Sequence, residues 1–124
     1  MLEIQEKTGD GGYEAVREWA GNAALHITEA LDRGTVCGFV AYAYEQKKTV
    51  IFAYDDGGDI VLCDGLIRSV MLKSTLKDIS NVEFRLADRD KLTTLRKLRF
   101  IADGETVSQN IDRFMNGCKE CKRS

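Results

Sequence analysis

The segment 35–56, TVCGFVAYAYEQKKTVIFAYDD, consists of two runs rich in strand-forming residues, separated by the polar stretch 45–48. Two such runs about a short polar turn predict a β-hairpin. Apolar residues occupy both the odd and the even positions of each run, so neither face of the hairpin is polar. Because a strand that is apolar on both faces must be covered on both, we expect helices on each side of the sheet.

Strict alternation along the hairpin also predicts which side chains share a face. In the second run it places Val50, Phe52 and Tyr54 on one face and Ile51 on the other. In the first run it places Cys37 in mid-strand among apolar neighbours, where we expect a small core residue. Cross-strand pairing of the hairpin tyrosines and phenylalanines under a helix explains their alternate positions without a ligand.

Changes in the period of the apolar positions define the other elements. From Asp59 to about Lys77, apolar residues recur at helical spacing, and Asp59 stands where a helix N-cap is expected. Before the hairpin, the pattern predicts a strand at 2–7, a helix at 13–20 and a strand at 25–31. After the hairpin come the helix from Asp59, a strand at 81–88 and a helix from 90 that leads into a strand at Phe100-Ile101. The last predicted element is a short helix within 105–117, which Gly117 ends.

This order predicts a single α/β (α+β) domain over 1–124, with 117–124 as a basic C-terminal tail. We expect a mixed, mostly antiparallel central sheet of five to six strands with helices on both faces. A chain of 124 residues is long enough to bury about two-thirds of the surface that its unfolded form exposes.

The composition bears on partners and location. A net charge of −2 is not typical of a dedicated nucleic-acid binder. No apolar run approaches the roughly 18 residues of a membrane helix, and the first residues lack the pattern of a secretion signal. We therefore expect a cytoplasmic protein whose cysteines are thiols. Acidic side chains predominate in 1–64 and basic ones beyond, which indicates two complementary halves or, alternatively, a cationic surface for an anionic ligand.

The stretch 86–100, LADRDKLTTLRKLRF, together with the element order, resembles the GCN5-related N-acetyltransferase (GNAT) fold family. It looks like the family's C-terminal signature, which closes as Leu-Tyr-x-x-Leu-Gly-Phe and here reads LRKLRF over 95–100. The resemblance implies an acyl-CoA N-acyltransferase-like fold, with acetyl-CoA bound where the fourth and fifth strands splay apart beside the helix from Asp59. Arg96 stands where the family commonly has a tyrosine that protonates the thiolate of coenzyme A, and arginine cannot supply that proton.

The turn at 55–65, DDGGDIVLCDG, departs from the family at its phosphate site. Members of the family carry Arg/Gln-x-x-Gly-x-Gly/Ala there, and backbone N–H groups bind the pyrophosphate. Here Gly57 and Gly58 are adjacent, and the glycines do not give that spacing. Asp55, Asp56 and Asp59 would repel a pyrophosphate. Gly57, Gly58 and Asp59 are the candidate cofactor contacts, but the pattern favours a simple strand-to-helix turn.

The terminal pair Cys118-x-x-Cys121 has the spacing of two metal ligands. A closed zinc site needs four ligands, so a frayed tail with exposed thiols is the simpler interpretation. Glu29 is the one charged residue in an apolar row and is a candidate catalytic base, with a solvent-facing edge strand as the alternative explanation. Arg96 is the other catalytic candidate.

His26 is the single histidine, and its strand pattern places it on the side of Thr28, where we expect a partly buried side chain rather than a general base. Arg68, Arg96 and Arg99 would form a cationic site if two helices converge, and would otherwise be solvated with their stems on apolar surface.

Three functional hypotheses follow. The first is a small acyl-CoA-dependent N-acetyltransferase that acts on an unidentified amine. The second is a non-catalytic domain of the same fold that binds a protein partner or another small ligand, and an aromatic plug between the fourth and fifth strands would favour it. The third is a metal or redox module built on the terminal cysteines. We expect no nucleic-acid or membrane partner, and an edge strand would permit a homodimer.

Overall fold

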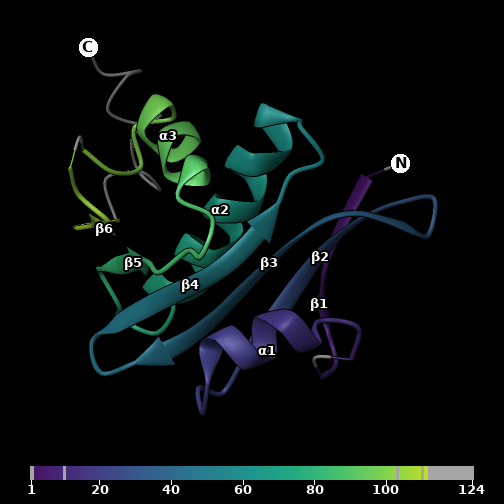
Figure 1. Cartoon of the computed structure of the whole chain (residues 1–124), viewed down its shortest axis with the longest axis horizontal. Helices are drawn as coiled ribbons and strands as arrows, with labels where there is room; N and C mark the ends of the chain where they lie inside the picture. The colour runs from purple at the N-terminus through teal and green to yellow at the C-terminus, as the bar shows by residue number, and fades with distance from the viewer. Residues whose placement is uncertain (1, 10, 103, 110, 112–124) are drawn as a thin grey trace.

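Strands that follow one another in the chain lie side by side in one sheet of order β1-β2-β3-β4-β5-β6 (Figure 1). The computed structural model describes residues 2–9, 11–102, 104–109 and 111. The strands in this part are β1 (Leu2–Lys7), β2 (His26–Asp32), β3 (Thr35–Glu45), β4 (Lys48–Asp55), β5 (Val82–Phe84) and β6 (Val107–Ser108), and the helices are α1 (Glu14–Ala20), α2 (Ile60–Thr75) and α3 (Asp90–Lys97).

The sheet is mixed and mostly antiparallel. All neighbouring strands pair antiparallel except β4 and β5, which are parallel. That exception follows from the connection, because α2 carries the chain back across the sheet between these two strands. The predicted hairpin at 35–56, the predicted fold class and the expected strand number are confirmed.

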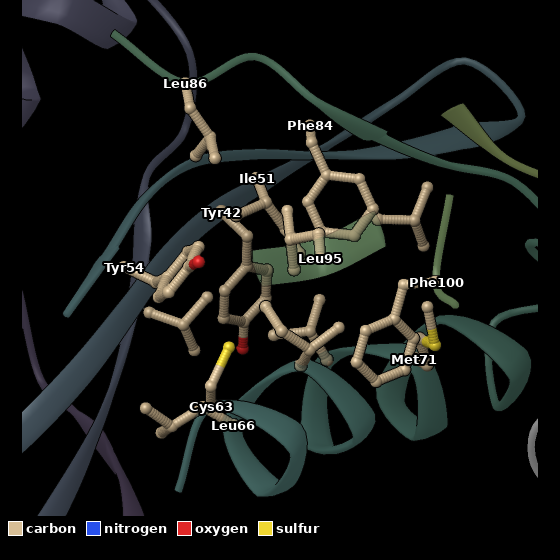
Figure 2. Close-up of a cluster of buried hydrophobic side chains, with 14 of the residues drawn as sticks. Tyr42, Ile51, Tyr54, Cys63, Leu66, Met71, Phe84, Leu86, Leu95 and Phe100 are labelled. Carbon is tan, nitrogen blue, oxygen red and sulfur yellow. The ribbon is translucent and has the colours of Figure 1, made fainter. Parts of the chain in front are cut away.

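Helices cover both faces of the sheet, as the apolar hairpin required. On one face, α1 packs Val16 and Ala20 against Ala43, Val50 and Phe52 of the hairpin. On the other face, α2 and α3 cover the larger core cluster, and Figure 2 shows Cys63 and Leu66 of α2 below the side chains of the sheet. The chain thus forms a three-layer arrangement in which the hairpin is the middle layer.

α2 begins where the sequence predicts. The Asp59 carboxylate accepts hydrogen bonds from the main-chain N–H groups of Val61 and Leu62, at 2.9 and 3.3 Å, and so acts as the N-cap. The buried face of the helix repeats at helical spacing through Leu66, Val70 and their neighbours. None of the described helices combines the length and apolar character needed to cross a bilayer.

The structure corrects three predicted elements after α2. The strand predicted at 81–88 is confined to β5, and Phe100-Ile101 is not a strand but a bend after α3. Phe100 and Ile101 are 1% and 5% exposed, so their apolar character reflects burial in the core, not strand pairing. Within 105–117, β6 pairs with β5 where a helix was predicted, and residues 112–117 lie outside the described residues.

Candidate functional site

β4 and β5 splay apart beside α2, as the resemblance implied. Their pairing ends at Ile51 and Phe84, and the last main-chain hydrogen bond between the two segments runs from the Arg85 N–H to the Ile51 carbonyl oxygen at 2.8 Å. β4 continues to Asp55, whereas the chain after Arg85 turns toward α3 (Figure 1). A gap in sheet pairing of this kind leaves room for side chains or a ligand.

A β-bulge at Phe52 sets the shape of this opening. The register of β3 against β4 shifts between Ala41 and Tyr42, which leaves Phe52 without a partner. Such an extra residue turns two successive side chains to one face and reverses the alternation beyond it. Phe52 therefore packs on the α1 side, whereas Tyr54 is buried in the cluster on the α2 side. The prediction that Tyr54 shares a face with Phe52 is wrong, because strict alternation does not anticipate the bulge.

A cavity of about 210 Å³, which we call the splay slot, lies in this opening. It is bounded by Phe52 to Tyr54 of β4, by residues 86–88 and by one face of α1. Trp19 of α1 lines the slot, and its indole Nε1 donates a 2.8 Å hydrogen bond to the Arg85 carbonyl oxygen, where β5 leaves the sheet. Asp88 and Lys91 are the charged residues of the lining. The slot is therefore apolar with two charged residues available to a polar group.

Tyr54 lies between the splay slot and the α2 side of the core. Its hydroxyl donates to the Lys91 carbonyl oxygen at 3.1 Å, and the Lys91 Nζ lies 4.8 Å from its ring centroid. Burial is the main cause that raises the pKa of Tyr54 far above its usual value, and burial also raises the pKa of Cys63 to about 11. Both are protonated at neutral pH, so neither is a ready nucleophile or base.

The turn between β4 and α2 uses its own carboxylates as hydrogen-bond acceptors. The Gly57 N–H donates to Asp55 Oδ1 at 2.9 Å, and the Gly58 N–H donates to Asp56 Oδ1 at 2.8 Å. Asp59 accepts from two further N–H groups at the start of α2. Both glycines have positive φ, so they serve the conformation of the turn.

These are the main-chain donors that a pyrophosphate at a helix N-terminus would need. Three carboxylates at the same place would also repel it. The turn therefore does not fit the pyrophosphate of coenzyme A, although Gly57, Gly58 and Asp59 lie together at the start of α2 as predicted. The sequence indicated the repulsion, and the structure adds that the donors are already occupied.

Glu29 lies on the α1 side, where its Oε2 accepts a 2.5 Å hydrogen bond from the Tyr13 hydroxyl. The Tyr13 ring packs against Phe39, with 4.7 Å between ring centroids. Burial and the hydrogen bond to Glu29 raise the pKa of Tyr13 well above its usual value, so the phenol remains a donor. The edge-strand explanation for Glu29 is wrong, because β2 lies between β1 and β3. The Tyr13 phenol thus holds Glu29 at Oε2, one of the two oxygens of the carboxylate.

The predicted arginine site is only partly assembled. α2 and α3 converge, since the Arg68 guanidinium lies 5.6 Å from the ring centroid of Phe100, just beyond α3. Arg68 also pairs with Asp64 of its own helix at 3.0 Å. Arg99 is exposed, and the Arg96 Nε is buried without a hydrogen-bond partner among the described residues. Arg96 cannot protonate a thiolate, because its guanidinium group does not give up a proton at neutral pH.

The cysteines and the histidine are dispersed. Cys118 and Cys121 lie outside the described residues, and within the part that the structure describes no three His, Cys, Asp or Glu side chains are grouped to hold a metal. Cys37 is exposed, so the prediction of a core residue is wrong. The residues on either side of Cys37 pair with β2, whereas Cys37 itself is the extra residue of a β-bulge and has no partner in β2. His26 is partly buried, as predicted.

Sequence reasoning missed Trp19 and Lys91 as lining of the splay slot. The sequence places both residues only within predicted helices, at 13–20 and from 90. The available signal was that the single tryptophan of the chain lies in a short helix. Periodicity cannot show that its indole reaches the end of a strand 66 positions away in the chain.

No protein-family model and no curated protein sequence matches this chain. Solved structures do match it. A ribosomal-protein-alanine N-acetyltransferase from Brucella melitensis biovar Abortus has 14% sequence identity and a TM-score of 0.60, over 83% of this chain and 94% of that chain.

Two further structures give the same result. A GNAT family acetyltransferase from Elizabethkingia anophelis, with acetyl-CoA bound, has 13% identity and a TM-score of 0.58 over 78% of this chain and 74% of that chain. An IAA acetyltransferase from Bacillus cereus has 12% identity and a TM-score of 0.58 over 79% and 75%. At these identities the likeness shows the architecture, which is that of the acetyltransferases the element order resembled.

Proposed function

Because this chain has the GNAT fold but occupies the donors of its phosphate turn with its own carboxylates, we propose that it is a non-catalytic binding domain. The proposed ligand is a small molecule with a short apolar chain or ring, held in the splay slot beside Trp19. The observation that carries the proposal is the set of hydrogen bonds from Gly57 and Gly58 to Asp55 and Asp56, because they replace the main anchor of coenzyme A.

The size of the slot limits the ligand. Ordinary small-molecule pockets have volumes of roughly 300–1,000 Å³, whereas the splay slot has about 210 Å³. A cavity of about 150 Å³ already holds a benzene ring. The slot therefore suits a group of a few carbon atoms, and the charged residues Asp88 and Lys91 in its lining are placed for a polar end of the same ligand.

A second candidate is N-acetyl transfer to an amine. The open splay and the likeness to a structure with acetyl-CoA bound support it. Glu29 would then be the base, with its Oε2 held by the hydrogen bond from the Tyr13 phenol. The two candidates differ in whether acetyl-CoA binds, and this difference can be measured.

Trp19 provides a site-specific probe for the first candidate, because it is the only tryptophan in the chain. We expect hexanoate or 1-hexanol to change its fluorescence in a saturable manner. The substitution Ala53→Leu fills the slot and should abolish the change. Ala24→Leu, at an exposed position outside the slot, is the control and should retain it. A wild-type emission that does not saturate with either probe would refute the proposed ligand site.

Thermal unfolding with acetyl-CoA separates the two candidates. A ligand present at 100 times its Kd stabilises the native state by about 2.7 kcal/mol, which raises Tm by several degrees. We expect acetyl-CoA to leave the wild-type Tm unchanged and to raise it in D55A/D56A, which frees the Gly57 and Gly58 N–H groups. D64N/D78N removes two carboxylates without freeing these donors and should behave like wild type. A clear shift in the wild type would instead support the transferase.

A further inference from the structure

A second groove lies on the α2 side of the sheet, away from the splay slot. It has a volume of about 530 Å³ and brings together residues from three strands, the last turn of α2 and the turn after it. We call it the lysine groove, and its lining consists of Glu6, His26, Tyr44, Lys73, Leu76 and Lys77.

Lys73 is held in the groove by hydroxyl groups and not by a carboxylate. Its Nζ donates to Thr28 Oγ1 at 2.8 Å and to the Tyr42 hydroxyl at 3.3 Å. Both acceptors belong to fully buried residues, so the ammonium group has a fixed position. An ammonium group has three donors, and these two bonds leave one for a ligand.

Lys77 adds a second positive charge in the turn just beyond the C-terminal end of α2. Its Nζ lies 4.9 Å from the ring centroid of Tyr44. Two ammonium groups that line one groove repel each other. Among the described residues, neither Lys73 nor Lys77 forms an ion pair with a carboxylate. The two ammonium groups therefore create a local excess of positive charge.

Glu6 offsets one of these two charges without pairing directly with either lysine. Its Oε1 lies 3.5 Å from His26 Nδ1 and accepts a 3.4 Å hydrogen bond from the Tyr42 hydroxyl. The His26 ring stacks on Tyr42 at 5.5 Å between centroids and contacts Tyr44 at 5.3 Å. Burial is the main cause that raises the pKa of Tyr44 to about 12, so its hydroxyl is a neutral donor at physiological pH. The groove thus offers two cations against one carboxylate.

We propose that the lysine groove binds a small oxyanion, a phosphate or a carboxylate group, between Lys73 and Lys77. The anion would accept the remaining hydrogen bond of Lys73 and would relieve the repulsion between the two ammonium groups. This site is independent of the proposed function, because it uses none of the residues that line the splay slot or form the aspartate turn.

His26 allows the site to be observed directly, because it is the only histidine of the chain. We would titrate the full-length protein with inorganic phosphate and, separately, with acetate, and follow the imidazole signals by NMR. Chloride would hold the ionic strength constant, and the pH would be fixed. We expect a saturable shift of the His26 signals with at least one of the two anions. The stronger of the two then identifies the phosphate or the carboxylate form of the ligand.

Substitutions at Lys77 test the assignment. K77Q should weaken binding about tenfold, which corresponds to one charge-assisted hydrogen bond. K77R keeps the charge and should retain binding. Lys97 is an exposed lysine at the C-terminal end of α3 and lines neither the lysine groove nor the splay slot, so K97Q is the charge-matched control and should bind like wild type. Unmoved His26 signals, or equal binding by K77Q and K97Q, would overturn the proposal.

Discussion

Among the described glycines, Gly38 has the least room for a side chain. It is buried in β3, and a Cβ built on it would lie 2.6 Å from the Asp55 carbonyl oxygen and 3.0 Å from Leu62 Cδ2. Its backbone is not in the left-handed region, so the obstacle to a side chain is space and not φ. The Asp55 oxygen is a main-chain atom at the end of β4 and cannot turn away as a flexible side chain would. We therefore predict that G38A separates β3 from the turn that leads into α2.

Overpacking a tight core site typically costs about 1–3 kcal/mol. Because the closest atom belongs to the backbone, we expect a loss near the upper end of this range, about 2–3 kcal/mol. For a chain of this length, one kcal/mol corresponds to a change in Tm of about 3–5 °C. G38A should therefore lower Tm by roughly 6–15 °C. The Trp19 hydrogen bond to Arg85 lies outside this contact and should persist in the folded variant.

Urea unfolding followed by circular dichroism measures the effect. Gly65→Ala is the matched control: Gly65 is inside α2, and an added Cβ would meet only Ile4 Cδ1, at 4.0 Å. Alanine is favoured over glycine in a helix interior by about 0.8–1.0 kcal/mol, so G65A should raise the midpoint. If G38A unfolds at the wild-type midpoint, or above it, then β3 and the start of α2 are not packed as described.

Two further predictions concern ionisation and thiol chemistry. Arg85, followed by Lys48, lowers the pKa of Glu83, so the ion pairs stabilise the fold above the unfolded pKa of Glu83 and this contribution is lost as the pH falls through the folded pKa. By urea unfolding, E83Q should therefore cost about 1–2 kcal/mol at pH 7 and progressively less as the pH falls below the unfolded pKa of Glu83; a pH-independent cost would contradict the assignment. In a variant with both terminal cysteines replaced by serine, one thiol, Cys37, should react rapidly with an aromatic disulfide reagent at pH 8, and Cys63 should react only after unfolding. Two rapidly reacting thiols would contradict the burial of Cys63.

Local patterns were sufficient where a short segment carries its own physical cause. The hairpin was predictable because strand-forming residues on both faces flank one polar turn. The start of α2 was predictable because an aspartate before an apolar helical repeat is a good acceptor for the free N–H groups of the first turn. The covering of both sheet faces followed from the same apolar pattern.

The same patterns failed where long-range pairing decides the outcome. The bulges at Cys37 and Phe52 arise from the register between strands, and they reversed the predicted environments of Cys37 and Tyr54. Phe100 and Ile101 read as a strand because apolar neighbours are typical of both strands and buried bends. β6 is a strand only because β5 offers its free edge to it. The expected homodimer stays a prediction.

The sequence alone therefore determined the class of fold and the presence of aspartates in the phosphate turn, because composition and period express local preference and charge. Only the tertiary structure decided that these aspartates occupy the turn's own N–H groups, that Trp19 lines a slot between β4 and β5, and that Lys73 and Lys77 share a groove with His26. Each of these depends on segments far apart in the chain, and their proximity is set by packing across the sheet rather than by spacing along it.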